Sequence, residues 1–145
     1  MNKLIWALLL MVMVGCSSKQ CDLFPQLRSR AGAGAVDCGY AVLNGDPQPV
    51  DRCVLDSFTG KASFIARYDR RGTDSKVVFG IAGDAQGTVT FLLWDGDPSG
   101  GSGADPVISG TECVGPTPDL STNRNSYTTP PLTCTSSTSL GRTCG

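Results

Sequence analysis

Seven cysteines constrain the fold of this 145-residue chain more than any other feature. No two of them form a Cys-x-x-Cys pair and the chain has no histidine, whereas structural zinc sites usually take their ligands in closely spaced pairs. Cysteines of an exported chain instead form disulfides, which require an even set. Because seven is odd, one cysteine must have a separate role. The seven are Cys16, Cys21, Cys38, Cys53, Cys113, Cys134 and Cys144.

The first fifteen residues have the pattern of an export signal. Lys3 precedes an apolar run from Leu4 to Val14, which is shorter than the ~20 residues that cross a bilayer but suits the core of a signal peptide. The run ends in Met13-Val14-Gly15-Cys16, which resembles a bacterial lipobox and departs from its usual pattern at Met13, where leucine is commonest. A plain secretory signal and a core helix of a cytosolic protein are the alternatives.

The lipobox resemblance implies a lipid anchor on Cys16. Residues 1–15 would be the signal peptide, and Cys16 would become the mature N-terminus, carrying a diacylglyceryl group and an acyl chain such as palmitate. Two or more chains give stable membrane anchoring. In this class an aspartate after the cysteine favours the inner membrane, but Ser17 and Ser18 follow here. We therefore expect the protein in the cell envelope, at the outer membrane or cell surface rather than the inner membrane.

Six cysteines remain for disulfides once Cys16 is set aside. Six allow 15 pairings, which the sequence alone does not resolve. We favour Cys38 with Cys53, since the loop between them contains turn-forming glycine and prolines. Cys113 would then pair with Cys134 or Cys144, and Cys21 with the one left over.

The composition bounds the organisation and the partners. The formal net charge is −1 and the basic residues are scattered, so we expect no nucleic-acid partner. Eighteen glycines and nine prolines favour turns over long helices. We interpret residues 16–35 as a flexible tether, because the Gly/Ala stretch before Val36 offers little to pack. Residues 36–145 would form a single small disulfide-bonded domain.

The periodicity of residues 50–94 predicts an α+β fold. Val50, Val54 and Phe58 share one face of a short helix over 50–58. Alternating apolar residues then predict strands over 62–70, 76–82 and 88–94, joined by short turns into a three-stranded antiparallel meander. Residues 98–145 are rich in Ser, Thr, Gly and Pro, so we expect an irregular segment held by disulfides.

Candidate binding residues cluster after the last predicted strand. Asp95, Asp97 and Ser99, followed by Gly100, resemble the opening of a calcium loop, and Asp105 could add a ligand. Pro106 stands where that pattern has a bidentate glutamate, and a polar turn is the alternative. Two aromatic residues, Trp94 and Phe24, are candidates for a recognition patch.

Catalytic patterns have little support in this chain. It has no histidine to act as a base, no Gly-x-Ser-x-Gly motif and a single glutamate, Glu112. A small aspartate-dependent hydrolase is therefore the weaker alternative to a non-enzymatic protein. We assign no catalytic residue and expect no cofactor.

A looser resemblance spans about residues 37–113. Asp37-Cys38-Gly39, Cys53, Gly72 to Ser75 and Trp94-Asp95 are similar in order to motifs of small uncharacterised cysteine-containing lipoproteins of deltaproteobacteria. These proteins have no assigned activity to carry over. We expect a membrane-anchored, non-enzymatic binding or envelope-structural module, with an envelope protein or glycan as partner. A calcium- or carbohydrate-binding module using the Asp95–Asp105 loop is the alternative.

Overall fold

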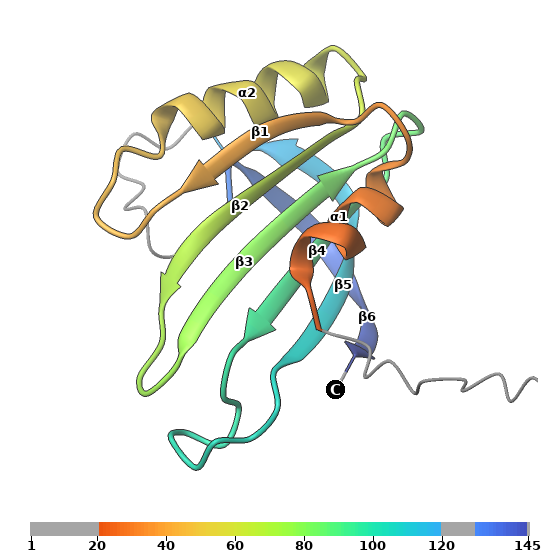
Figure 1. Cartoon of the computed structure of the whole chain (residues 1–145). Helices are drawn as coiled ribbons and strands as arrows, with labels where there is room; N and C mark the ends of the chain where they lie inside the picture. Colours follow the sequence, from red (N-terminus) through yellow and green to blue (C-terminus); the bar gives the residue numbers. More distant parts are fainter. Residues whose placement is uncertain (1–20, 120–129, 145) are drawn as a thin grey trace, which may run out of the picture.

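The computed structural model describes residues 21–119 and 130–144, which form a six-stranded mixed sheet and two helices (Figure 1). The strands follow one another in the sheet in chain order. β1 is parallel to β2, and every other neighbouring pair is antiparallel. The elements are α1 (Leu23–Ala31), β1 (Val36–Ala41), α2 (Gln48–Thr59), β2 (Phe64–Arg71), β3 (Lys76–Gly83), β4 (Val89–Asp95), β5 (Val107–Pro118) and β6 (Leu132–Cys144).

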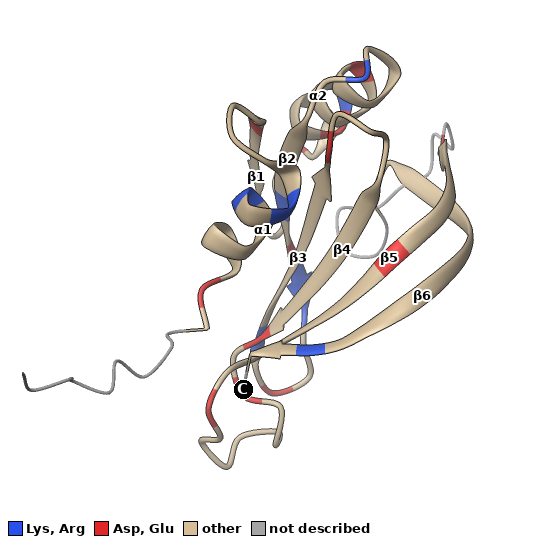
Figure 2. Cartoon of the chain, turned by 90° about the vertical axis from the view of Figure 1, so that its right-hand side faces the viewer, with Lys and Arg blue, Asp and Glu red and all other residues tan. Residues whose placement is uncertain are grey.

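The two helices cover opposite faces of the sheet. α2 is the crossover between the parallel strands β1 and β2 and packs against both of them. α1 packs against β2, β3 and β4 on the other side, as Figures 1 and 2 show together. We call these sides of the sheet the α1 face and the α2 face. Successive residues of a strand point to opposite faces, so each strand contributes to both layers.

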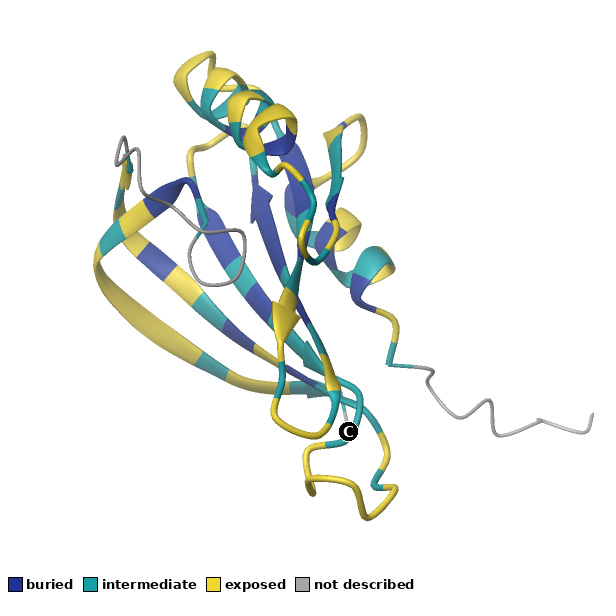
Figure 3. Ribbon diagram, turned by 90° about the vertical axis from the view of Figure 1, so that its left-hand side faces the viewer, coloured by how far each residue is buried: buried dark blue, intermediate teal, exposed yellow. Residues whose placement is uncertain are grey.

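Two apolar cores follow from this arrangement (Figure 3). On the α2 face, Val54 of the helix packs in a cluster with Phe64 and Ile81 of the sheet. On the α1 face, Leu27 packs with Ile65 and Leu92. All of these side chains are buried. Phe64 and Ile65 are neighbours in β2 but belong to different clusters, so β2 is covered on both faces. A small domain needs such double coverage to bury enough apolar surface.

The expected fold class, a short helix followed by a three-stranded antiparallel meander, is wrong. That helix and meander exist, as α2 and β2–β4 near the expected bounds, but they form only part of a six-stranded mixed sheet. The segment expected to be irregular contains β5 and β6, the two longest strands. Low apolar content misled the prediction, because backbone hydrogen bonds to a neighbouring strand need no apolar side chain and threonine favours strands.

The expected tether over residues 16–35 also needs correction, because it contains α1. Leu23, Leu27 and Ala31 lie four residues apart and are the buried residues of this helix. The Asp22 side chain caps the helix by accepting a hydrogen bond from the Phe24 N–H at 3.0 Å. The Gly/Ala composition of residues 31–35 concealed this helix, although its apolar spacing is regular.

The six remaining cysteines form three disulfides, which confirms the prediction of disulfide bonding. The pairs are Cys21–Cys144, Cys38–Cys53 and Cys113–Cys134. Cys38–Cys53 ties β1 to α2, and Cys21–Cys144 ties the segment before α1 to the end of β6. Cys16 lies outside the described residues.

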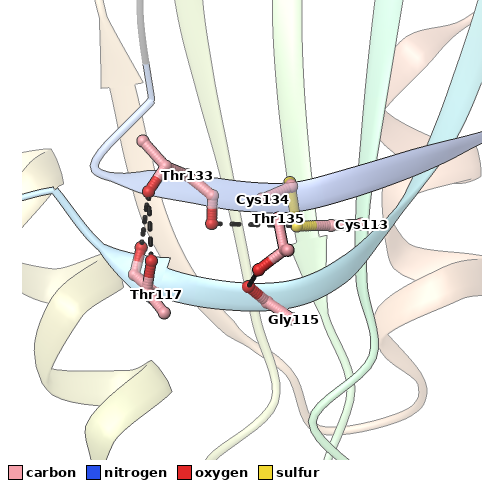
Figure 4. The surroundings of a disulfide bond; sticks show 6 residues. All are labelled: Cys113, Gly115, Thr117, Thr133, Cys134 and Thr135. Atoms are coloured by element: carbon pink, nitrogen blue, oxygen red, sulfur yellow. Dashed lines mark hydrogen bonds between the residues drawn. A yellow bond between two sulfur atoms is a disulfide. The ribbon is translucent and has the colours of Figure 1, made fainter.

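The Cys113–Cys134 bridge joins β5 to β6 and has threonine hydroxyls around it (Figure 4). The Thr117 and Thr133 hydroxyls are 3.1 Å apart across the two strands. The Thr135 hydroxyl donates to the Gly115 carbonyl at 3.4 Å. Cross-strand hydroxyl pairs of this kind stabilise a sheet where apolar pairs are missing, so this Ser/Thr-rich segment can be regular structure.

Candidate functional site

A pocket of about 280 Å³ opens on the α1 face, between the first turn of α1 and the sheet. We call it the α1 pocket. The strand register explains its composition: Tyr40 of β1 lies opposite Arg67 of β2, and Trp94 of β4 lies opposite Val78 of β3. Its lining residues are Cys21, Asp22, Leu23, Phe24, Tyr40, Arg67, Lys76, Val78 and Trp94. The pocket therefore combines three aromatic side chains with two cations and one carboxylate.

Cations and aromatic rings alternate along the pocket. The Arg28 and Arg67 guanidinium carbons lie 4.9 and 4.6 Å from the centre of the Phe24 ring. The Arg67 guanidinium carbon also lies 5.5 Å from the centre of the Tyr40 ring, and the Lys76 Nζ atom lies 5.9 Å from it. Distances within about 6 Å allow cation–π attraction. The rings thus hold the cations in place while leaving their N–H groups available as donors.

Two carboxylates that do not line the pocket pair with its cations. Asp37 lies 3.5 Å from Arg67, and Asp69 lies 3.9 Å from Lys76. Asp69 also accepts the Tyr40 hydroxyl and the Leu43 N–H. The Arg67 Nε atom is buried and has no hydrogen-bond partner among the described residues. A guanidinium has five N–H donors, so Arg67, whose side chain is 26% exposed, has further donors for a bound acceptor.

Trp94 connects the sheet side of the pocket to the residues just before α1. Its indole Nε1 donates to the Cys21 carbonyl at 2.9 Å. Cys21 is held again by its disulfide to Cys144, next to Thr143, whose hydroxyl donates to the Gln26 side chain at 2.6 Å. The pocket wall is therefore rigidly attached to the root of the N-terminal segment.

Tyr40 makes the stability of the fold depend on pH in the alkaline range. Burial, followed by the hydrogen bond and charge of Asp69, raises the pKa of the Tyr40 phenol well above its ordinary value, with Arg67 opposing the shift. A raised folded-state pKa leaves stability constant below about pH 10 and reduces it as the pH rises above the unfolded-state value. We expect urea unfolding to show this decline, and the Tyr40→Phe variant to show a shallower one. Equal slopes for the two proteins would contradict the assignment.

A second hollow, of about 420 Å³, lies on the α2 face where α2 does not reach. We call it the α2-face groove. Phe79 and Phe91 are half-buried there, with ring centres 5.4 Å apart. Ser109, Thr111 and Ser139 supply hydroxyls, and Arg142 supplies a guanidinium. An apolar floor beside hydroxyls could contact the ring of a sugar or a flat apolar group.

The structure does not assemble the suggested calcium site. Asp95 accepts the Ser75 hydroxyl at 2.7 Å, and the Asp97 carboxylate accepts backbone N–H groups that include those of Gly101 and Gly103. Those N–H donors face the carboxylate where a cation would bind, which opposes cation binding. Asp105 is exposed. In the described ranges, no group of three or more His, Cys, Asp or Glu side chains could hold a metal ion.

Asp97 instead organises the β4–β5 loop. Hydrogen bonds from the Ser99 hydroxyl and then from the Gly103 N–H lower the pKa of the Asp97 carboxyl to about 2. A depressed pKa means that the loop's stabilisation is present above the unfolded-state pKa of about 4 and is lost as the pH falls through the folded-state value. We expect NMR to find the Asp97 carboxyl titrating near pH 2. In the Asp97→Asn variant the Gly103 amide should exchange faster, and unchanged protection would contradict this role.

The sequence singled out only part of this geometry. Phe24 and Trp94 do line one pocket, but Trp94 lies on a face that α1 covers, which the expectation of a tether there had missed. Tyr40, Arg67 and Lys76 were not anticipated. Among these three residues, only Arg67 has a sequence signal. It lies on the opposite face of β2 from Phe64 and Tyr68, and a residue at such a position usually contacts solvent.

No protein-family model, curated protein or solved structure matches this chain. Over residues 21–119 and 130–144, neither helix has the length and apolar character of a membrane span.

Proposed function

We propose that this protein is an exported lipoprotein, anchored in the cell envelope through Cys16, that acts as a non-enzymatic binding module. The α1 pocket is its ligand site. The observation that carries this proposal is that two cations, Arg67 and Lys76, line one pocket together with three aromatic side chains. The ligand is an anion with an apolar portion, because cations and aromatic side chains line the same hollow.

The disulfides support the exported part of the proposal. Six cysteines in three bridges are typical of an oxidising compartment, which the cytosol is not. Removing Cys16 from the set is what makes the count even. The anchor itself rests on the lipobox resemblance and on this count.

The intact mass of the protein in the membrane fraction tests the anchor. We expect a chain that begins at Cys16 and carries acyl groups, with six alkylated thiols that appear only after reduction. A mass that retains residues 1–15, or thiols that react before reduction, would refute export and anchoring together.

Binding of anilinonaphthalene sulfonate, an anion with apolar aromatic rings, tests the α1 pocket. We expect the Arg67→Gln/Lys76→Gln variant to bind this dye about tenfold more weakly, since two charge pairs open to solvent contribute up to about 1 kcal/mol each. The matched control is Arg52→Gln/Lys61→Gln, which removes the same two charges from exposed positions on α2 and the turn after it. Equal affinity in the two variants would place the dye elsewhere.

Calcium separates this proposal from the alternative of a calcium-binding module. A ligand that binds the native state raises its stability in proportion to ln(1 + [L]/Kd). Because Asp97 is engaged by N–H donors, we expect millimolar calcium to leave the melting temperature unchanged. A rise that the Asp97→Asn variant abolishes would restore the calcium alternative.

A further inference from the structure

We propose that the α1 pocket binds the phosphate of phospholipid headgroups in the same membrane that holds the Cys16 anchor, so that the α1 face lies against the bilayer. This inference rests on the proposed function, because it requires the anchor. It names the ligand of the pocket and sets the orientation of the domain on the membrane.

The chain between the Cys16 anchor and the pocket is short. Cys21 lines the pocket and stands five residues after Cys16. Five residues span at most about 18 Å even when fully extended. Cys21 cannot move away from the sheet, because its disulfide to Cys144 and the hydrogen bond from Trp94 hold it there. The pocket therefore stays close to the headgroups whenever the anchor is inserted.

The cations that line the pocket suit a phosphate ligand. Arg67 and Lys76 each contact one carboxylate at long distance and keep further N–H donors, and phosphate oxygens are strong acceptors for such cations. The Lys76 side chain is 63% exposed, so it can reach outward, whereas the Arg67 side chain is 26% exposed and sits deeper. Trp94 also lines the pocket, and tryptophan is enriched at the membrane–water interface.

The carboxylates near the pocket do not occupy all the donors of its cations. The Asp22 carboxylate is engaged by the Phe24 N–H as the helix cap. Asp37 contacts Arg67 at 3.5 Å and Asp69 contacts Lys76 at 3.9 Å, both at the long end for an ion pair. A phosphate can therefore approach the other N–H groups of both cations. The ammonium of an ethanolamine headgroup would find these same carboxylates beside it.

Trp94 is the experimental probe, since it is the only tryptophan in residues 16–145 and lines the pocket. The lipidated mature protein is reconstituted into phosphatidylethanolamine–phosphatidylglycerol vesicles, with or without a nitroxide label on the headgroups. We expect the label to quench Trp94 fluorescence. In the Arg67→Gln/Lys76→Gln variant the ratio of docked to undocked protein should fall about 30-fold, the effect of two cations at an anionic surface.

Three results would overturn the inference. Unquenched Trp94 in protein whose acylated mass is confirmed would refute the headgroup site and leave the anchor intact. Equal quenching in the Arg67→Gln/Lys76→Gln variant and in the Arg52→Gln/Lys61→Gln control would show proximity through the tether alone. Saturation of the pocket by inorganic phosphate in neutral detergent micelles, seen as a shift of Trp94 emission, would assign it to a soluble anion. An unacylated mass would instead refute the proposed anchor itself.

Discussion

Replacing Cys21 and Cys144 by serine is expected to lower the free energy of unfolding by about 5 kcal/mol, the largest effect of any disulfide in the chain. The two cysteines are 123 residues apart, against 15 for Cys38–Cys53 and 21 for Cys113–Cys134. A longer loop has more conformational entropy in the unfolded chain, so closing it stabilises the native state more. Because domains of this size have only about 5–15 kcal/mol of stability, the variant should be close to unfolded.

The matched control is replacement of Cys38 and Cys53, which closes a short loop and should cost about 3 kcal/mol. Both variants are measured by guanidinium unfolding with the other two bridges intact. The double alanine variant of Cys21 and Cys144 separates the bridge from any effect of the serine hydroxyls. A smaller loss for the long bridge than for Cys38–Cys53 would mean that the ends of the domain are not held together in solution.

The same bridge bears on the α1 pocket. Without it, Cys21 keeps the hydrogen bond from Trp94 and its packing against the α1-face core, but the start of α1 is no longer tied to the end of β6. Any variant that retains folded structure should then bind anilinonaphthalene sulfonate more weakly, even though Arg67 and Lys76 are unchanged. Stability and binding are coupled here because one covalent bond closes the domain and forms one wall of the pocket.

The central part of the fold was predictable because its signals are local. The spacing of Val50, Val54 and Phe58 predicts α2, and the alternation of Val77, Phe79 and Ile81 predicts β3. Both patterns arise from side chains that face a core, and a core-facing residue must be apolar wherever its partners come from.

The remaining strands were missed because their stabilisation is not local. β6 is an edge strand whose side chains are mostly exposed serine and threonine, so it has almost no apolar alternation. Its order comes from pairing with β5 and from two disulfides. A pattern of apolar residues cannot report a strand that has no buried face.

The α1 pocket was missed for a related reason. Tyr40, Arg67 and Lys76 come from three different strands, and only the register of β1, β2 and β3 brings them together. Each of them taken alone has the sequence context of a solvent-exposed strand residue. The two aromatic residues that were singled out, Phe24 and Trp94, were detectable because large aromatic side chains are seldom placed on a surface without a partner.

Replacing Leu27 by alanine tests the element that the sequence analysis missed, and is expected to cost about 3 kcal/mol. Leu27 is fully buried between α1 and the sheet. Both of its terminal methyl groups lie over Gly80, where an added Cβ atom would come within 2.9 Å of them. The glycine thus lets the helix approach β3 closely, and shortening Leu27 leaves a cavity that neither a rigid sheet nor a bridged helix can fill.

Ser29 on the exposed side of α1 supplies the control, since its replacement by alanine should change the free energy of unfolding by less than about 0.5 kcal/mol. If residues 23–31 were part of a flexible tether, the two variants would behave alike, because an undocked leucine contributes nothing to folding. A large loss for Leu27→Ala alone therefore requires a docked helix. The docked helix also places Phe24, one turn before Leu27, in the lining of the α1 pocket.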